Sequence, residues 1–559
     1  MAFNLKDYKN NLLFIPIGGS NEIGINVNLY HIDGKFIMVD CGAGFADSDL
    51  PGVDMIVADM SFIEQNKKNL LALVLTHAHE DHLGAVQYLW NNLDCPIYAT
   101  NFTANFLKLR LADYGMTKKL QINQLKPGAK IDLAPFSIEM VPLSHSAPEM
   151  QALMIRTRLG NILHTGDWKF DPEPIIGEAN DEVVLRKLGD EGILALTCDS
   201  TNIFNQKTSG SEGDLRKSLV DIIAGCPKMV VATTFASNLA RLDTLIHAGQ
   251  KAGRKVMLTG RSLHRILMAA QESGYLNDIS PLIDEREFAR YKREELLVIA
   301  TGCQGEPMAA AAKMANNVHQ WVKLAPKDTV IFSSKIIPGN DKKIFKMFNI
   351  FVKSGIEVIT ERDHFVHVSG HPGVEDLKRM YDLARPKICI PVHGEPVHIH
   401  EHAKFARKSG IKQAVEVENG SVVLLDEHSP KIVGKIPVGY LAVDGNYLVP
   451  TESPVFKTRK RLAESGIVVV SVFVDKNNRI ISRPIISMPG LLDYQDDAQF
   501  IDEIKNEISK ILQTQNMNSR GSTTREQIET LIKSNMRRIL KTEMNKSPIT
   551  IVNIEQMRN

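Results

Sequence analysis

Four potential metal ligands lie within six residues of one another, directly after an apolar run. The run Leu71–Leu75 leads into Thr76-His77-Ala78-His79-Glu80-Asp81-His82. Ionisable groups that leave a buried strand are costly to desolvate unless they bind a metal or polar partners. Neutral imidazole and carboxylate are the usual ligands of zinc. The segment therefore predicts a metal site at the end of a strand, in a layered fold that presents side chains at the edge of a sheet.

The local backbone expected here divides these ligands into two pairs. In an extended segment His77 and His79 point the same way and can share one ion. A helix that starts near Asp81 turns Asp81 and His82 towards a second ion. Three more candidates each follow a short apolar run: His145, Asp167 and His393. Singly, each could equally be a hydrogen-bonded histidine or an aspartate in a turn. Together the seven residues complete two coordination shells, and Asp167 is the bridging ligand.

The length and the pattern of elements predict several domains. At 559 residues the chain exceeds one ordinary core. Short strand candidates and amphipathic stretches over the first 200 residues or so indicate an α/β layered fold. From about 206 to 365, helix and strand alternate more regularly, as in a doubly wound α/β unit. Because Ile388–Pro391 is again a strand candidate that ends before a histidine, we expect the second unit to be inserted into the first.

This organisation gives five predicted segments. Residues 1–205 form the first part of the ligand-bearing domain, 206–365 the inserted domain and 366–436 the second part of the ligand-bearing domain. Residues 437–455, with several glycines and prolines, are expected to be a linker. Residues 456–559 are expected to form a small α+β domain, with a strand at Ile467–Val474 and helices at 498–514 and 524–541.

Composition narrows the class of protein. The six cysteines are scattered, which argues against a disulfide framework and favours reduced thiols. No apolar run is long enough for a bilayer and the first residues lack a signal-peptide pattern, so we expect no membrane partner and a cytoplasmic protein. The net charge of +1 conceals an acidic segment at residues 1–205 and a basic segment at residues 206–365. An acidic segment suits cation ligands and a basic one suits a polyanion, although random variation between domains is the alternative.

The ligand pattern resembles the signature of the metallo-β-lactamase superfamily. Val39-Asp40-Cys41-Gly42 is similar to its first motif, in which the aspartate supports the metal loop. Five further motifs are Gly18-Gly19-Ser20-Asn21-Glu22-Ile23-Gly24, Asp199-Ser200-Thr201-Asn202, Thr234-Phe235-Ala236-Ser237-Asn238, His367-Val368-Ser369-Gly370-His371 and Pro391-Val392-His393-Gly394-Glu395. They resemble those of the β-CASP nucleases, specifically the bacterial ribonuclease J family, in order over nearly the whole chain.

The resemblance implies a fold and an activity. The fold is α/β: a metallo-β-lactamase αββα sandwich interrupted by a β-CASP domain, plus a C-terminal α+β domain that supports a homodimer or homotetramer. The activity is that of a ribonuclease with two Zn²⁺ per subunit, which Mn²⁺ or Mg²⁺ could replace in assays. It is both a 5′-to-3′ exonuclease and an endonuclease in rRNA processing and mRNA decay, and its substrate is single-stranded RNA, with 5′-monophosphate ends favoured.

The resemblance also implies roles for individual residues. His371 contacts the scissile phosphate, and the pocket includes His367, Val368, Ser369 and Gly370, while Asp40 and Asp199 support the site. Metal ions activate a water whose proton Asp81 accepts or orients, and His371 protonates the leaving 3′ oxygen. Two helix N-termini could also receive phosphate, through Phe235, Ala236, Ser237, Asn238, Arg261 and Ser262. A plain N-cap explains either serine almost as well.

Two other functions are consistent with part of the pattern. A small-molecule hydrolase of the lactamase or thioesterase type would use the same metal ligands but leaves the insertion and the His367–His371 motif unexplained. A catalytically inactive RNA-binding scaffold is the non-enzymatic alternative. Such proteins usually lack several ligands, whereas all seven are present here.

Overall fold

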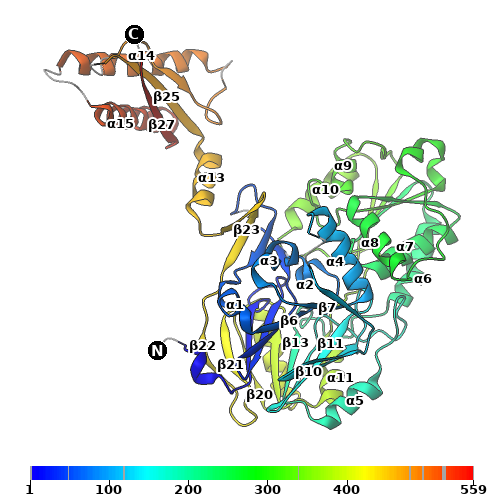
Figure 1. The fold of residues 1–559 in the computed structure, drawn as a ribbon. Helices are drawn as coiled ribbons and strands as arrows, with labels where there is room; N and C mark the ends of the chain where they lie inside the picture. Colours follow the sequence, from blue (N-terminus) through cyan, green and yellow to red (C-terminus); the bar gives the residue numbers. More distant parts are fainter. Residues whose placement is uncertain are drawn as a thin grey trace. The chain divides into compact units, whose positions relative to one another are not determined.

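The computed structural model describes residues 3–47, 49–116, 120–337, 339–476, 480–493, 496–518 and 524–557. It divides into two compact units, which are described separately (Figure 1). Unit 1 comprises Met1–Gly44 and Ile56–Tyr440, and unit 2 comprises Phe45–Met55 and Leu441–Asn559. Within the described part of the chain, no helix combines the length and the apolar character needed to cross a membrane.

Two mixed sheets make up the first part of unit 1. The eight-stranded sheet has the order β22-β21-β1-β2-β3-β6-β7-β8, and the seven-stranded sheet has the order β20-β19-β13-β12-β11-β10-β9. The strands of the first are β1 (Leu13–Gly18), β2 (Val27–Ile32), β3 (Lys35–Val39), β6 (Leu70–Val74), β7 (Ile97–Thr100), β8 (Ile122–Leu125), β21 (Ser421–Leu424) and β22 (Lys431–Lys435). Those of the second are β9 (Lys130–Leu133), β10 (Phe136–Pro142), β11 (Gln151–Thr157), β12 (Gly160–His164), β13 (Ala195–Asp199), β19 (Ile388–Val392) and β20 (Gln413–Ala414).

The two sheets pack face to face over a shared core. Buried side chains from both sheets, such as Phe14, Tyr30, Ile138 and Ile390, form one apolar cluster. A second cluster covers the outer face of the seven-stranded sheet with α5 (Glu182–Glu191), α11 (Val374–Ala384) and α12 (Pro396–Lys408). Beside the eight-stranded sheet lie α1 (Ser61–Gln65), α2 (Glu80–Leu83), α3 (Val86–Leu93) and α4 (Asn101–Asp113) (Figure 1). The expected αββα sandwich is confirmed.

The inserted part of unit 1 is built on a separate parallel sheet. Its order is β15-β16-β14-β17-β18, and every pair is parallel. The strands are β14 (Val230–Thr233), β15 (Lys255–Thr259), β16 (Leu296–Ala300), β17 (Thr329–Phe332) and β18 (Glu357–Ile359), and the helices are α6 (Glu212–Gly225), α7 (Leu239–Lys251), α8 (Arg261–Glu272), α9 (Ala310–Ala315) and α10 (Asp341–Lys353). The apolar strands are buried on both faces, as parallel strands require. The predicted doubly wound α/β insertion is therefore confirmed.

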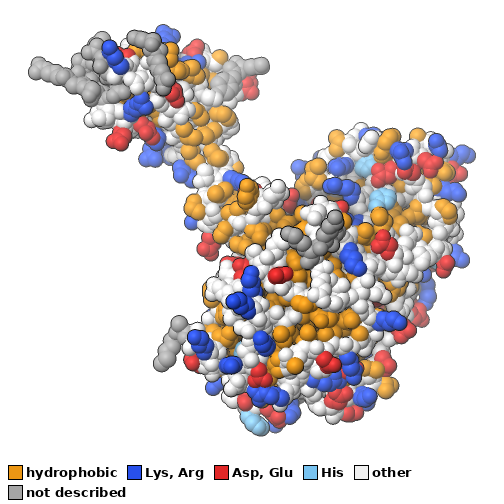
Figure 2. Space-filling view, in the orientation of Figure 1, with side chains coloured by type: hydrophobic (Ala, Val, Ile, Leu, Met, Phe, Trp, Pro, Cys, Tyr) orange, Lys and Arg blue, Asp and Glu red, His pale blue; other side chains and the backbone are white. Residues whose placement is uncertain are grey.

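The surface of this part carries both signs of charge. On the face shown in Figure 2, basic and acidic side chains are interspersed over the helices of the inserted sheet. The basic excess predicted for residues 206–365 is thus not gathered into one patch on this face. Because charges of opposite sign within a Debye length offset one another, a polyanion would be guided by local groups there rather than by a single field.

Unit 2 contains a three-stranded sheet covered by helices. The order β26-β25-β27 joins β25 (Ile467–Val474), β26 (Ile485–Ser487) and β27 (Ile549–Gln556), and the helices are α13 (Pro454–Ser465), α14 (Ala498–Asn518) and α15 (Arg525–Met544). The predicted strand and both predicted helices are confirmed. The final strand β27 was not predicted, and its residues alternate between half-buried and exposed positions. The short segment Phe45–Met55 also belongs to unit 2. Nothing in its sequence predicts that assignment.

The segment predicted as a linker is not irregular. It contains β23 (Tyr440–Asp444) and β24 (Tyr447–Pro450), which pair antiparallel as a hairpin. Gly445 lies at the turn with a φ of 61°, a conformation that glycine adopts without strain. The linker at 437–455 stays a prediction, and the structure adds that Gly445 belongs to a hairpin turn, which has the same local signal as a flexible connection. Two further strands, β4 (Ala43–Phe45) and β5 (Met55–Ala58), complete the description of the fold.

Candidate metal centre and the adjoining histidine loop

Strands of both sandwich sheets end at one place in unit 1. In the eight-stranded sheet, β3 runs parallel to β6 and the two lead into Asp40 and His77. In the seven-stranded sheet, the parallel strands β12, β13 and β19 lead into Asp167, Asp199 and His393. Parallel neighbours end at the same edge of a sheet, so their side chains converge without any special loop. Short apolar strands thus deliver the ionisable residues to one edge of the core.

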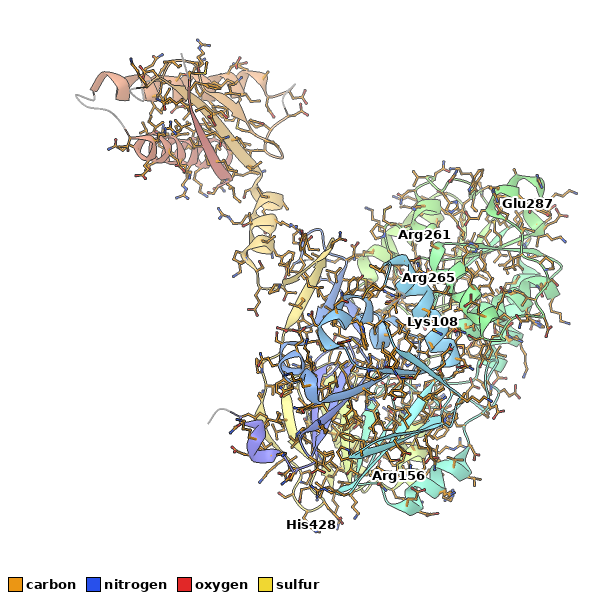
Figure 3. The ribbon with its side chains drawn as sticks, in the orientation of Figure 1. Lys108, Arg156, Arg261, Arg265, Glu287 and His428 are labelled. Atoms are coloured by element: carbon orange, nitrogen blue, oxygen red, sulfur yellow. The ribbon has the colours of Figure 1, made fainter. Side chains whose placement is uncertain are left out.

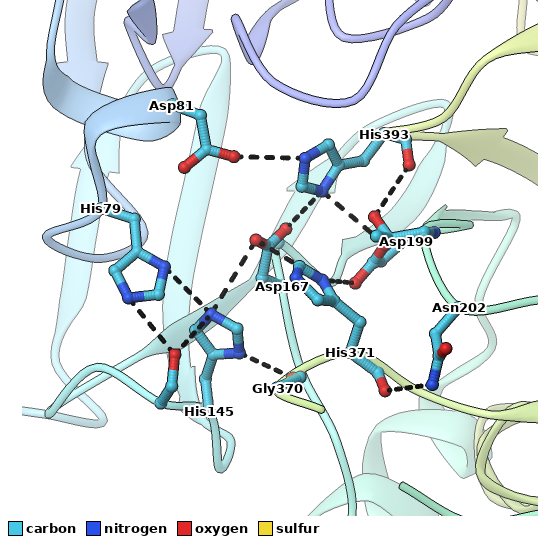
Figure 4. A network of polar contacts seen from close by, with 12 residues as sticks. His79, Asp81, His145, Asp167, Asp199, Asn202, Gly370, His371 and His393 are labelled. Atoms are coloured by element: carbon cyan, nitrogen blue, oxygen red, sulfur yellow. Dashed lines mark hydrogen bonds and ion pairs between the residues drawn. The ribbon is translucent and has the colours of Figure 1, made fainter. Parts of the chain in front are cut away.

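The seven predicted ligands fall into two groups that share one carboxylate. The donor atoms of His77, His79, His145 and Asp167 lie within 4.8 Å of one another, and so do those of Asp81, His82, Asp167 and His393. His79 is the N-cap of α2, so the first turn of this helix directs Asp81 and His82 towards the second group of donors. Figure 4 shows Asp167 at the centre of this network.

Neighbouring polar groups orient the imidazole rings. His82 Nδ1 donates to Asp40 Oδ2 at 2.7 Å, which leaves Nε2 facing Asp167 Oδ2 at 3.2 Å. Asp40 also accepts from the backbone N–H of Thr76 at 2.8 Å. His145 Nδ1 donates to the carbonyl of Gly370 at 2.7 Å, which leaves its Nε2 for the cluster. Fixing one ring nitrogen selects the tautomer that offers the other to a metal.

The donor set fits divalent cations. Five of the seven residues are buried, while His79 and Asp81 are half-buried, and Nε2 of His77 and both oxygens of Asp167 have no hydrogen-bond partner among the described residues. Their close contacts are those of an ion-pair network, with His393 Nδ1 at 2.8 Å from Asp167 Oδ1 and His77 Nε2 at 3.9 Å from Asp167 Oδ2. Buried polar atoms without partners are costly, and cations would satisfy several of them together.

The electrostatics of the cluster separate two kinds of histidine. Burial and then the neighbouring histidines hold the pKa of His77 and of His145 well below the ordinary value. Burial also opposes protonation of His82 and His393, but the carboxylate of Asp167 and its acidic neighbours outweigh it and raise their pKa well above the ordinary value. The carboxylates therefore hold protons on two histidines that a cation would have to displace.

His371 adjoins the cluster from the inserted side. Its Nδ1 donates to Asp199 Oδ2 at 2.8 Å and lies 3.7 Å from Asp167 Oδ2 (Figure 4). Burial alone would lower the pKa of His371, but Asp199 and Asp167 raise it above the ordinary value. Asp199 Oδ1 in turn accepts from the N–H of Thr201 at 2.8 Å. The arrangement gives a histidine whose raised pKa favours the protonated ring and whose side chain is about a quarter exposed, at 24%.

The loop of residues 366–371, here called the histidine loop, packs directly on a predicted ligand. An added Cβ at Gly370 would lie 2.6 Å from Cε1 of His145, so only glycine fits there. The carbonyl of His371 accepts from Asn202 Nδ2 at 3.3 Å and from Ser209 Oγ. Ser369 Oγ accepts from the N–H of His371 at 3.1 Å, while Val368 is buried. The loop is therefore held on several sides beside the cluster.

The structure places the other candidate phosphate-binding residues at the starts of two helices of the inserted part. Asn238 is the N-cap of α7 and accepts from Arg241 N at 2.8 Å, and Phe235, Ala236 and Ser237 precede it, partly buried. Arg261 and Ser262 are exposed at the start of α8, which packs on α4 near Lys108 (Figure 3). Arg265, further along α8, pairs with Asp113 of α4.

Sequence reasoning missed two kinds of residue at the site. Asn26 is buried and its Nδ2 lies 3.0 Å from His82 Nε2 and 3.5 Å from Asp81 Oδ2. Gly19 accepts from the backbone N–H of His393 at 2.6 Å. A single asparagine or a backbone carbonyl has no spacing pattern that could reveal it. The Gly-rich motif before Asn26 was the available signal.

Four family models match successive parts of the chain. They are the metallo-β-lactamase superfamily over residues 21–179, the ribonuclease J β-CASP domain over 227–351, the Zn-dependent metallo-hydrolase RNA specificity domain over 355–416 and the ribonuclease J C-terminal domain over 454–557. The third match spans both the histidine loop and His393. Each part of the fold that supplies a residue to the cluster thus has a matching model.

Whole-chain comparisons agree. The chain is 40% identical to ribonuclease J of Sinorhizobium meliloti over 496 residues, 88% of each chain. It is 34% identical to ribonuclease J of Corynebacterium glutamicum over 511 residues, which is 90% of this chain and 70% of that protein. It is also similar in fold to a protein of unknown function from Enterococcus faecalis, with a TM-score of 0.53, 18% identity and coverage of 74% of this chain and 100% of the other.

Proposed function

Since the chain belongs to the ribonuclease J family and is therefore a metal-dependent ribonuclease, we propose that two Zn²⁺ ions per subunit bind its two ligand groups. The observation that carries this proposal is the sharing of the buried Asp167 by two groups of donors. His77, His79 and His145 complete one group, and Asp81, His82 and His393 complete the other. Imidazole and carboxylate in these numbers suit zinc, with Mn²⁺ or Mg²⁺ able to support assays.

The chain's own residues supply the remaining chemistry. When bound, the cations would lower the pKa of water and neutralise phosphate charge. Asp81, whose Oδ2 lies 3.2 Å from His393 Nε2, accepts or orients the proton of the attacking water. His371 donates its Nδ1–H to Asp199, so the proton for the leaving 3′ oxygen comes from Nε2 of the protonated ring. Asp40 and Asp199 act through the histidines that they orient.

We assign the phosphate contacts of RNA to the histidine loop. His367, Val368, Ser369, Gly370 and His371 lie beside the cluster, where backbone N–H groups and a protonated ring attract an anion. The N-terminus of α7, at Phe235, Ala236, Ser237 and Asn238, and that of α8, at Arg261 and Ser262, are further contacts along the RNA. An anion site at a fixed distance from the cluster would favour single-stranded RNA with a 5′-monophosphate.

Several wider properties form part of the same proposal. The enzyme combines 5′-to-3′ exonuclease and endonuclease activity in rRNA processing and mRNA decay. It forms a homodimer or homotetramer through residues 456–559, where β27 is an exposed edge strand able to pair with another copy. Six free cysteines are consistent with a reducing cytoplasm. The matches at 227–351 and 454–557 support the predicted inserted domain 206–365 and terminal domain, and with them the division of 1–205, 366–436 and 437–455.

The test uses one RNA labelled at its 5′ end and the same RNA labelled at its 3′ end. Zinc-loaded protein should release mononucleotides from the 5′ end and also cut internally, faster with a 5′-monophosphate than with a 5′-triphosphate. His77→Ala should lose cleavage together with zinc. Equal rates on the two 5′ ends would contradict the phosphate site. Full activity of His77→Ala with zinc still bound at both sites would contradict the ligand assignment.

A further inference from the structure

Arg241 of α7 has a fully buried side chain, and each of its nitrogens donates a hydrogen bond. Nε and Nη2 donate to the two carboxylate oxygens of Glu212, at 3.2 and 2.8 Å. Nη1 donates to the carbonyl and to the hydroxyl of Ser333, both at 2.8 Å. A planar guanidinium suits such fixed, bidentate contacts, and a lysine could not make them all.

The same guanidinium reaches the histidine loop. Nη1 lies 3.4 Å from the carbonyl oxygen of Val366, and Nη2 lies 3.5 Å from that of Val368. Ser333 Oγ also donates to the carbonyl of Val366, at 2.7 Å. One charged group therefore contacts the backbone on both sides of His367. This is the stretch of chain that leads directly into His371.

The acidic partner of Arg241 is anchored to the segment that carries a metal ligand. The backbone N–H of Glu212, at the start of α6, donates to Asp171 Oδ2 at 3.0 Å. Asp171 pairs with the buried Lys169, whose Nζ lies at 2.9 Å, and both follow Asp167 along one loop. A continuous set of buried polar contacts thus runs from the loop of Asp167, through Glu212 and Arg241, to the histidine loop.

These contacts lie where the chain enters and leaves the inserted part. Glu212 follows the entry into that part, and the histidine loop follows the exit from it. A buried charge must be compensated, so the position of the Arg241–Glu212 pair fixes both segments relative to each other. A displacement on the order of 1 Å in a catalytic group costs about 100-fold in rate, so the orientation of this loop matters for the reaction.

We propose that Arg241 is a positioning residue for RNA cleavage: by holding the backbone of Val366 and Val368, it sets the orientation in which His371 meets the leaving oxygen. The proposal rests on the function proposed above for His371. It assigns to the inserted part of the chain a direct effect on the protonation step, although Arg241 itself touches neither the substrate nor a metal ligand.

The test compares two leaving groups on the zinc-loaded full chain. An RNA oligonucleotide needs its 3′ oxygen protonated, whereas bis(p-nitrophenyl) phosphate releases p-nitrophenolate without a proton. Arg241→Lys should lower kcat for RNA about 100-fold, and should lower the rate on the activated ester far less. Ser333→Ala removes two contacts of the same network, those of its hydroxyl with Arg241 and with the carbonyl of Val366, and should show the same selectivity at about 3- to 10-fold.

Arg254→Lys is the matched control. Arg254 is also a buried arginine of the inserted part, with Nη1 donating to the carbonyl of Lys228 at 2.7 Å and Nη2 to that of Cys226 at 2.5 Å, at the opposite end of the parallel sheet. This variant should lower thermal stability as much as Arg241→Lys does. It should leave the ratio of the two rates as in the wild type.

The outcomes separate the two proposals. Equal losses on both substrates in Arg241→Lys and Ser333→Ala, or a wild-type rate on RNA, overturn the positioning role. If Arg241→Lys does not fold, Ser333→Ala decides by the same ratio. His371→Ala is measured alongside: equal losses on both substrates in that variant show that the proton-donor role of His371 is wrong. If His371→Ala loses more activity on RNA than on the activated ester, but Arg241→Lys loses the same on both, only the positioning role is overturned.

Discussion

Each predicted metal ligand follows a strand of the two sandwich sheets or starts the helix after one, whereas His371 lies in a loop held largely by the inserted part of the chain. The ligands are supported mainly by other residues of the sandwich, such as Asp40 for His82, which is 42 residues away. The histidine loop depends on partners distant in sequence, including Asn202, Ser209 and Arg241. The difference suggests that metal binding and RNA cleavage can be changed separately. The expected effects below run from the largest to the smallest.

Asp167→Ala should have the largest effect, because Asp167 contributes to each group of donors. We expect no detectable RNA cleavage and weaker binding of both ions, a greater loss than the roughly 100-fold typical of residues that only support ligands. Metal content by mass spectrometry and cleavage of labelled RNA measure the two effects. Asp132→Ala, at an exposed carboxylate of β9, is the control. Two tightly bound ions in Asp167→Ala would contradict the shared-ligand arrangement.

His371→Ala tests the other side of the comparison. We expect kcat for RNA to fall by about 100- to 10,000-fold, the usual contribution of a proton donor, with both ions still bound. Because His371 lies only 3.7 Å from Asp167 Oδ2, the alternative is that it binds a metal itself. Loss of an ion in this variant would assign His371 to the metal centre and remove the distinction between the two regions.

The same difference explains what the sequence could reveal. His77, His79, Asp81 and His82 form a dense cluster after an apolar run, so local pattern is enough to place them on a loop and a helix start. Grouping His145, Asp167 and His393 with them required chemistry, because each alone is ambiguous. The fold and the activity were then predicted from the resemblance of the ordered motifs to those of a known family.

Other features had no local signal. The contacts of Arg241 with Glu212 and Ser333 join residues far apart in the chain, and nothing in the sequence indicates that this arginine is buried. The hairpin at Gly445 was predicted as a linker because a turn and a flexible connection share their residue types. Contacts between distant residues decide the first case, and the local pairing of two strands across a turn decides the second.

Asp40→Asn should produce an intermediate effect on the metal side. Asp40 is fully buried and orients His82 by accepting from Nδ1, so the amide keeps the shape but loses the charge. We expect zinc affinity to fall by about 10- to 100-fold, and the rate at saturating zinc to be much less affected. A zinc titration of activity measures both. An unchanged titration midpoint would show that the ring needs no such support.

Zinc binding should depend on pH in a defined direction. The carboxylates raise the pKa of His82 and His393 above the ordinary value, so both rings hold protons near neutral pH in the metal-free protein. Only the neutral ring binds a metal, so affinity should rise with pH until those pKa values are passed, by about tenfold per pH unit for each displaced proton. Competition with a chelator between about pH 6.5 and 8 measures the slope. A flat profile would show that the rings are already neutral.

Ser209→Ala should give the smallest effect and the finest test of the comparison. Ser209 Oγ donates to the carbonyl of His371 and accepts from Asn202 Nδ2 at 3.2 Å, but Asn202 Nδ2 also donates to that carbonyl at 3.3 Å and remains in the variant. Loss of one such hydrogen bond costs about 0.5–1.5 kcal/mol, which corresponds to a fall in kcat of about 2- to 10-fold if it acts on the transition state. Zinc content should not change, since no predicted ligand loses a contact. Ser137→Ala, which removes a hydrogen bond to the exposed Asp132 at 2.9 Å, is the matched control. A fall in zinc affinity in Ser209→Ala alone would show that the histidine loop also supports the ions, through the contact of Gly370 with His145.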